Sequence, residues 1–200
     1  MEDAQRRSTA RRLAWAALLN LALCGAELAG GLAGHSLSLQ LDAVHNLSDE
    51  ASLVLLAVAF LRPHGRVSSA LTRVANVASV IGLVSISLLV CWQAIVRFSN
   101  PVAIEAGIVG GVGVLAVLGN LGVAWILRAP ARLDGSVRLA YLHNLGDAGA
   151  SLAPVVAGLL ALWTGTSLFD PLLALLVAGW ILFETWRELR HEHSHSGEPH

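Results

Sequence analysis

The sequence predicts an all-α membrane protein with six transmembrane helices and both termini in the cytosol. Of its 200 residues, 55% are hydrophobic and 14% are charged, whereas an ordinary soluble domain carries about 25% charged residues. The mean hydropathy of +0.65 places the chain in the membrane class. The net charge is −1, and no basic stripe with interleaved aromatic residues indicates a nucleic acid partner. We therefore expect the lipid bilayer to surround most of the chain.

Six apolar stretches follow a polar beginning, and each is long enough to cross a hydrocarbon core of roughly 30 Å. Segments with proline or glycine separate most of them, and their length and lack of alternation exclude a membrane β-barrel. The predicted organisation is a cytosolic tail at 1–12, a transmembrane domain at 13–190 and a short His-rich cytosolic tail at 191–200. The six spans are placed near Leu13–Gly34, Ser38–Leu61, Val74–Phe98, Val102–Leu127, Val137–Trp163 and Ser167–Trp186.

The arginines predict the orientation in the membrane. All 13 basic residues are arginine. With the N-terminus inside, only Arg97 lies near an outer loop, and the positive-inside rule therefore favours cytosolic termini. The use of arginine without lysine, together with abundant alanine and glycine, is typical of GC-rich prokaryotic genomes. We expect a multi-pass protein of a prokaryotic cell (inner) membrane.

Small residues predict how the helices approach one another. Gly30 and Gly34, and again Gly107 and Gly111, are four residues apart, a spacing that lets two helices come close together. Because glycine is also frequent in transmembrane helices generally, we expect ordinary packing within the chain at these positions rather than a dimer seam.

Two similar motifs, HNLSD in the second span and HNLGD in the fifth, contain the candidate site. Ionisable groups inside a membrane span are costly and usually functional. His45 and Asp49, like His143 and Asp147, are four residues apart and share one helix face. At 1.5 Å per residue, Asp49 lies about 15 Å and Asp147 about 12 Å from opposite membrane faces. The motifs should therefore meet near the midplane, where two imidazoles and two carboxylates suit tetrahedral Zn²⁺ better than Mg²⁺ or Ca²⁺.

Other polar residues near these motifs are candidates for secondary binding or proton coupling. Asp42 shares the helix face of His45, either as a partner of a ligand or as an entrance residue. Glu27 is a carboxylate within the first span and either handles protons or forms structural hydrogen bonds. His64 is the one obvious ligand in the loop after the second span. Contacts between helices are expected from Glu50, Asn76 and Asn120.

These motifs resemble the signatures of a known transporter family. The run Ser36–Asp49 resembles the second-helix signature of the cation diffusion facilitator family, zinc-transporter type, and Tyr141–Ala148 resembles the fifth-helix signature. The resemblance covers about residues 13–190, and the doubled His-x-x-x-Asp motif is its specific part. Smaller matches are Arg97 with Pro101 after the third span and Asp170-Pro171 before the sixth.

The resemblance implies a transporter rather than an enzyme. His45, Asp49, His143 and Asp147 would bind the transported metal, and a homodimer would exchange cytosolic Zn²⁺ for protons. The sequence leaves open whether Co²⁺, Cd²⁺ or Fe²⁺ accompanies Zn²⁺. Most family members continue after the sixth helix into a cytosolic metal-binding domain. This chain stops at residue 200, so we expect either a short natural member or a shortened chain.

Two other functions are compatible with the same residues. A membrane scaffold or sensor would hold the metal as a purely structural ion. An intramembrane zinc hydrolase would need an open coordination position and a nearby general base, for which only Glu50 or Glu27 is available.

Overall fold

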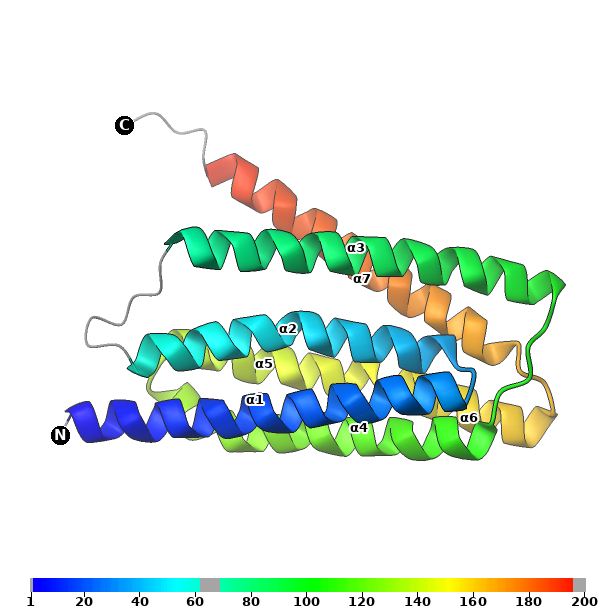
Figure 1. Cartoon of the computed structure of the whole chain (residues 1–200), viewed down its shortest axis with the longest axis horizontal. Coiled ribbons are helices and arrows are strands. Elements are labelled where there is room, and N and C mark those ends of the chain that lie inside the picture. Colours follow the sequence, from blue (N-terminus) through cyan, green and yellow to red (C-terminus); the bar gives the residue numbers. More distant parts are fainter. Residues whose placement is uncertain (1, 62–68, 196–200) are drawn as a thin grey trace.

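The computed structural model describes residues 2–61 and 69–195, and every regular element in these ranges is helical (Figure 1). The predicted all-α fold class is therefore confirmed. The elements are α1 (Glu2–Ala33), α2 (Leu37–Leu61), α3 (Ser69–Ser99), α4 (Ala106–Leu127), the 3₁₀ turn η1 (Pro130–Arg132), α5 (Gly135–Ala150), α6 (Leu152–Thr164) and α7 (Phe169–His195).

Six segments of the described chain are long and apolar enough to cross a membrane. Five of them are single helices, and α5 and α6 together make the fifth. Helix α1 includes most of the polar segment 1–12, because this segment contains neither glycine nor proline and is rich in alanine and arginine, which favour helix. The segments are Ala4–Ala33, Leu37–Leu61, Val77–Ser99, Ala106–Leu127, Gly135–Thr164 and Phe169–Arg187.

The helices pack in two groups that share α2 (Figure 1). Helices α1, α4, α5 and α6 form one group with α2, whereas α3 runs beside α7. Each group has its own apolar core. Leu53 and Ala57 of α2 pack with α1 and α4, while Leu37 and Leu41 of α2 pack with α3 and α7. Helix α2 therefore connects the two groups.

Glycine allows the closest contact between helices α4 and α6. A Cβ atom on Gly158 would lie 2.6 Å from the backbone nitrogen of Gly110, so a larger residue would force the two helices apart. The predicted packing is confirmed at Gly30, where a Cβ would lie 2.8 Å from Val112 of α4. It is wrong at Gly107 and Gly111, where a Cβ would meet nothing within 4 Å. These two glycines face away from the neighbouring helices, because a four-residue spacing does not determine how a helix is rotated about its axis.

The fifth span is broken near its middle, although the sequence prediction treated it as one apolar stretch. Helix α5 ends at Ala150 and α6 begins at Leu152. Pro154 explains the break, because proline removes a backbone donor and clashes with the preceding turn. The Ser151 hydroxyl accepts a hydrogen bond of 3.1 Å from the Asn120 side chain of α4. This bond confirms the interhelical contact predicted for Asn120 and fixes the break one turn after Asp147.

A buried carboxylate joins α7 to the beginning of α2. Asp170 is fully buried, and its Oδ2 accepts a hydrogen bond of 2.7 Å from the Leu37 N–H. Its Oδ1 accepts bonds of 2.6 Å from the Ser36 and Ser38 hydroxyls and 3.2 Å from the Ser38 N–H. Arg97 of α3 lies 3.5 Å away. Asp170 therefore caps α2 from another helix and satisfies donors that α2 cannot pair internally.

Candidate metal centre

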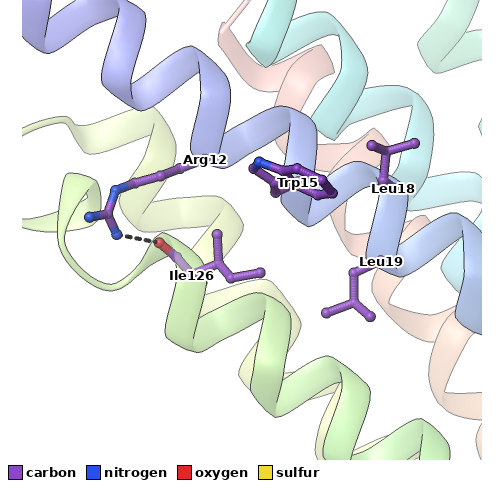
Figure 2. Close-up of a pocket in the computed structure, with 5 residues that line it drawn as sticks. All are labelled: Arg12, Trp15, Leu18, Leu19 and Ile126. Carbon is purple, nitrogen blue, oxygen red and sulfur yellow. Dashed lines mark hydrogen bonds between the residues drawn. The ribbon is translucent and has the colours of Figure 1, made fainter.

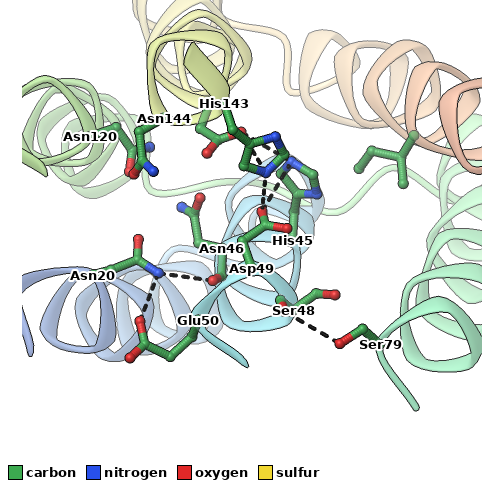
Figure 3. Close-up of polar contacts among 12 residues, drawn as sticks. Asn20, His45, Asn46, Ser48, Asp49, Glu50, Ser79, Asn120, His143 and Asn144 are labelled. Atoms are coloured by element: carbon green, nitrogen blue, oxygen red, sulfur yellow. Dashed lines mark hydrogen bonds and ion pairs between the residues drawn. The ribbon is translucent and has the colours of Figure 1, made fainter. Parts of the chain in front are cut away.

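The four side chains predicted to bind metal lie together between α2 and α5. Figure 3 labels three of them, His45, Asp49 and His143. One donor atom from each residue can be chosen so that all four lie within 4.8 Å of one another. Between the helices, His45 Nε2 is 3.3 Å from Asp147 Oδ1, and His143 Nε2 is 3.0 Å from Asp49 Oδ2. Within each helix, the His–Asp separations are 3.6 Å and 3.8 Å.

These distances are close to those of a tetrahedral zinc site. With Zn–N and Zn–O bonds of about 2.0–2.2 Å, tetrahedral ligand atoms lie roughly 3.3–3.6 Å apart. The four His–Asp separations range from 3.0 to 3.8 Å, so small side-chain movements would suffice to enclose an ion. Two carboxylates balance the charge of a divalent cation, and imidazole suits Zn²⁺ and similar transition metals.

The cluster opens on one side into a cavity of about 780 Å³. The side chain of His143 is 49% exposed, whereas that of Asp147 is 6% exposed, so access is on the His143 side. The cavity extends along α7 from Leu173 to Thr185. Glu184 supplies the third carboxylate among the residues that line this cavity, and it forms an ion pair of 2.7 Å with Arg187.

A buried polar layer on the α1 side of α2 holds that helix in place (Figure 3). The Asn20 side chain donates to the backbone oxygen of Asn46 (3.0 Å) and to Glu50 Oε2 (3.1 Å). The Asn46 side chain donates to both oxygens of Glu27, at 3.0 Å each. Glu50 is therefore a helix contact, as the sequence predicted. Because Asn46 follows His45 directly, these bonds fix the rotation of α2 that points His45 toward α5.

The secondary candidates are not members of the four-residue cluster. Asp42 is buried, lies near the hydroxyl of Ser151 and has an Oδ2 atom without a hydrogen-bond partner in the described part of the chain. Glu27 is fully buried and bonded to Asn46, which favours the structural alternative for this residue. His64 lies outside the described residues. A role in proton coupling stays a prediction for Asp42 and Glu27.

The sequence prediction missed some of the residues that position the cluster. Asn46 occurs inside the first motif, and an asparagine occupies the same place, Asn144, in the second. This repetition indicates that the motif also contains residues that position the predicted ligands. Ser151 gave no such signal, because its role depends on the break in the fifth span and on Asn120 of α4.

Comparisons with known proteins found a matching family model and several similar bacterial proteins. Residues 13–194 match the family model described as cation efflux transmembrane domain. The chain is 36% identical over 191 residues to the zinc transporter ZitB of Escherichia coli, covering 92% of this chain and 61% of ZitB. It is 33% identical over 161 residues to a Bacillus subtilis protein named cadmium, cobalt and zinc/H(+)-K(+) antiporter, covering 76% and 52% of the two chains. The chain thus spans between half and two thirds of the length of these relatives.

Proposed function

We propose that this chain, which belongs to the cation efflux transmembrane domain family, moves Zn²⁺ out of the cytosol in exchange for protons. The observation that carries the proposal is the meeting of two His–Asp pairs from separate helices within 4.8 Å. The six apolar segments and the bacterial relatives support a multi-pass protein of the prokaryotic inner membrane.

The donor set supports Zn²⁺ as the substrate. His45, Asp49, His143 and Asp147 would hold the ion by two nitrogens and two oxygens, a set that closes a tetrahedral site. Co²⁺ and Cd²⁺ are further candidate substrates, since the name of the B. subtilis relative includes cobalt and cadmium, and Fe²⁺ is chemically similar enough to be tested with them. Four protein ligands leave no open position for a hydrolytic water, which argues against a zinc hydrolase.

Exchange with protons follows from the chemistry of the same four groups. Zn²⁺ binds neutral imidazole and ionised carboxylate, so that protons and metal compete for the site. Exposed to the cytosol, the deprotonated site would take up Zn²⁺. Exposed to the other side, incoming protons would weaken the site and release the ion. The H(+) in the name of the B. subtilis relative supports an exchange of metal for protons.

The two helix groups suggest how access could alternate. Three of the elements that line the cavity are α5, α6 and α7, so a movement of the α3–α7 pair relative to the other group would change its opening. Such rigid movement of one helix group against another is the usual basis of alternating access. The cavity extends to Glu184, near the end of α7 that the arginine distribution assigns to the cytosol.

Zinc flux into proteoliposomes with an imposed proton gradient tests the proposal. Asp49→Ala and Asp147→Ala are each expected to reduce flux more than about 100-fold, because even residues that only orient a ligand cost roughly 10–100-fold. The matched control is Asp134→Ala, which removes a carboxylate that caps α5 through Ser136 and Val137 and does not belong to the cluster. Its flux should stay within about twofold of wild type, since losing such a cap costs about 1 kcal/mol of stability.

The same experiment distinguishes the alternatives. If both cluster variants transport Zn²⁺ at the wild-type rate, the site assignment is wrong. If the wild-type chain binds one Zn²⁺ per cluster but shows no flux at any imposed gradient, the metal is structural and the scaffold or sensor alternative is correct. Zinc flux that does not respond to the proton gradient would refute the exchange with protons but would not contradict the assignment of the metal site.

A further inference from the structure

A second cavity lies on the outer surface of the helix bundle, between α1 and α4 (Figure 2). Its volume is about 440 Å³, within the range of small-ligand sites, which are mostly apolar and have a few fixed polar groups. It shares no lining residue with the cavity at the candidate metal centre. We call it the α1–α4 groove, and it is lined by Arg12, Trp15, Leu18, Leu19 and Ile126.

Arg12 is the one charged residue of the groove, and a hydrogen bond holds it at one end (Figure 2). Its Nη1 donates to the carbonyl oxygen of Ile126, 3.4 Å away, in the last turn of α4. A guanidinium has five N–H donors, so most of them remain available to an anion. None of the ion pairs in the described part of the chain involves Arg12. The planar arrangement of these donors matches the oxygens of a phosphate group.

The groove crosses the boundary between the polar and apolar parts of the two helices. Arg12 ends the polar segment of α1, and the apolar residues begin with Leu13. Trp15 and Leu18 are 61% and 57% exposed on the apolar side, and tryptophan is typical of the level of the lipid headgroups. A ligand that fits this groove therefore has a charged end beside Arg12 and an apolar end beside Leu18.

The surroundings of the groove are positively charged. Arg11 and Arg128 are exposed at the same end of α1 and α4, and Arg132 follows in η1. None of the five lining residues is acidic. Basic pockets between transmembrane helices on the cytoplasmic side favour anionic lipid headgroups, and this end is the one that the arginine distribution assigns to the cytosol.

We propose that the α1–α4 groove binds an anionic phospholipid. The phosphate group accepts hydrogen bonds from the free N–H groups of Arg12, and an acyl chain lies along Trp15, Leu18 and Leu19. The bound lipid spans α1 and α4 and so stabilises the helix group that carries the metal ligands. A soluble anion would use Arg12 but leave the apolar wall of the groove exposed, which is why the lipid fits this site better than free phosphate.

Native mass spectrometry of the full chain in detergent tests this proposal, with dioleoylphosphatidylglycerol as the probe. Wild type is expected to retain this lipid at concentrations at which dioleoylphosphatidylcholine is not retained. Arg12→Gln should weaken retention about tenfold to a hundredfold, since a charge-assisted hydrogen bond is worth about 1.5–3 kcal/mol. The matched control is Arg11→Gln, which removes the same charge from the next residue, outside the groove, and should change retention less than about threefold.

Two further measurements keep the result independent of folding and of lipid charge alone. Leu18→Trp fills the groove while leaving Arg12 in place, and it should also weaken retention. Zinc binding at His45 and Asp49 should be unchanged in all three variants, which shows that they are folded. Equal loss in Arg11→Gln and Arg12→Gln, or full retention in Arg12→Gln, would mean that the positive end attracts anionic lipid without a specific site. Displacement of the lipid by equimolar inorganic phosphate would identify the ligand as an anion and overturn the proposal.

Discussion

Replacing Asp170 by alanine should destabilise the protein more than replacing Asp134, the residue that caps α5. The carboxylate accepts four hydrogen bonds from three consecutive residues, Ser36 to Ser38, and lies 3.5 Å from Arg97. It is fully buried, so water cannot replace it. Asp170→Ala leaves two backbone N–H groups of α2 unpaired and Arg97 without its carboxylate.

The magnitude follows from the buried ion pair. Removing one partner of such a pair costs about 3–5 kcal/mol, because the remaining charge is left uncompensated. Asp170→Asn keeps an acceptor oxygen but loses the charge, so it should cost about 1.5–3 kcal/mol, the range of one hydrogen bond to a charged group. Asp134→Ala is the matched control, because Asp134 caps α5 through two backbone N–H groups in a less buried position, and a cap of this kind is worth about 0.5–2 kcal/mol.

The assay is reversible unfolding of the detergent-solubilised chain by sodium dodecyl sulfate, followed by circular dichroism. The order of stability should be wild type, Asp134→Ala, Asp170→Asn and then Asp170→Ala. If the free energies of unfolding of Asp170→Ala and Asp134→Ala differ by less than about 1 kcal/mol, the buried network contributes no more than an ordinary cap. The expected effect of burial would then be refuted.

Two other predictions concern the cavity and the helix packing. Glu184→Gln should raise the KM of Zn²⁺ flux roughly two- to fivefold at an unchanged maximal rate, since a partly exposed charge is worth up to about 1 kcal/mol. Glu105→Gln is the control, because Glu105 lies outside the cavity. A lowered maximal rate in Glu184→Gln would contradict a role at the entrance only. Gly158→Ala should lower the free energy of unfolding by about 1–3 kcal/mol, because it forces α4 and α6 apart. Gly111→Ala should leave it unchanged, because a Cβ at Gly111 meets nothing within 4 Å. Equal stability of the two variants would show that the Gly110–Gly158 contact does not contribute to stability.

The sequence predicted what depends on periodicity and composition. The spans follow from runs of apolar residues, and the cluster follows from two His–Asp pairs with a spacing that matches the helical repeat. Features that depend on tertiary placement were not predictable. Three such features are the side of α4 that carries Gly107, the identity of the partner of Asn120 and the bond from Asp170 to α2. Each depends on how the helices are rotated and on which helix ends meet. Homodimer formation and proton exchange stay predictions, since neither follows from the geometry of one chain.

The position of α2 links the stability of the fold to the proposed transport. Its first turn is bonded to Asp170 of α7, and Asp170 is paired with Arg97 of α3. Its middle is bonded to α1 through Asn46 and Glu27, next to the predicted ligand His45. The α3–α7 pair is therefore tied to α2 at the end where α2 begins, and a relative movement of the two groups has its smallest amplitude there. The cavity reaches Glu184 at the opposite end of α7, where no such buried network ties the described part of the chain to α2. In the proposed transport cycle, a rocking movement would thus change access to the predicted metal ligands at that end while the Asp170 network stays intact.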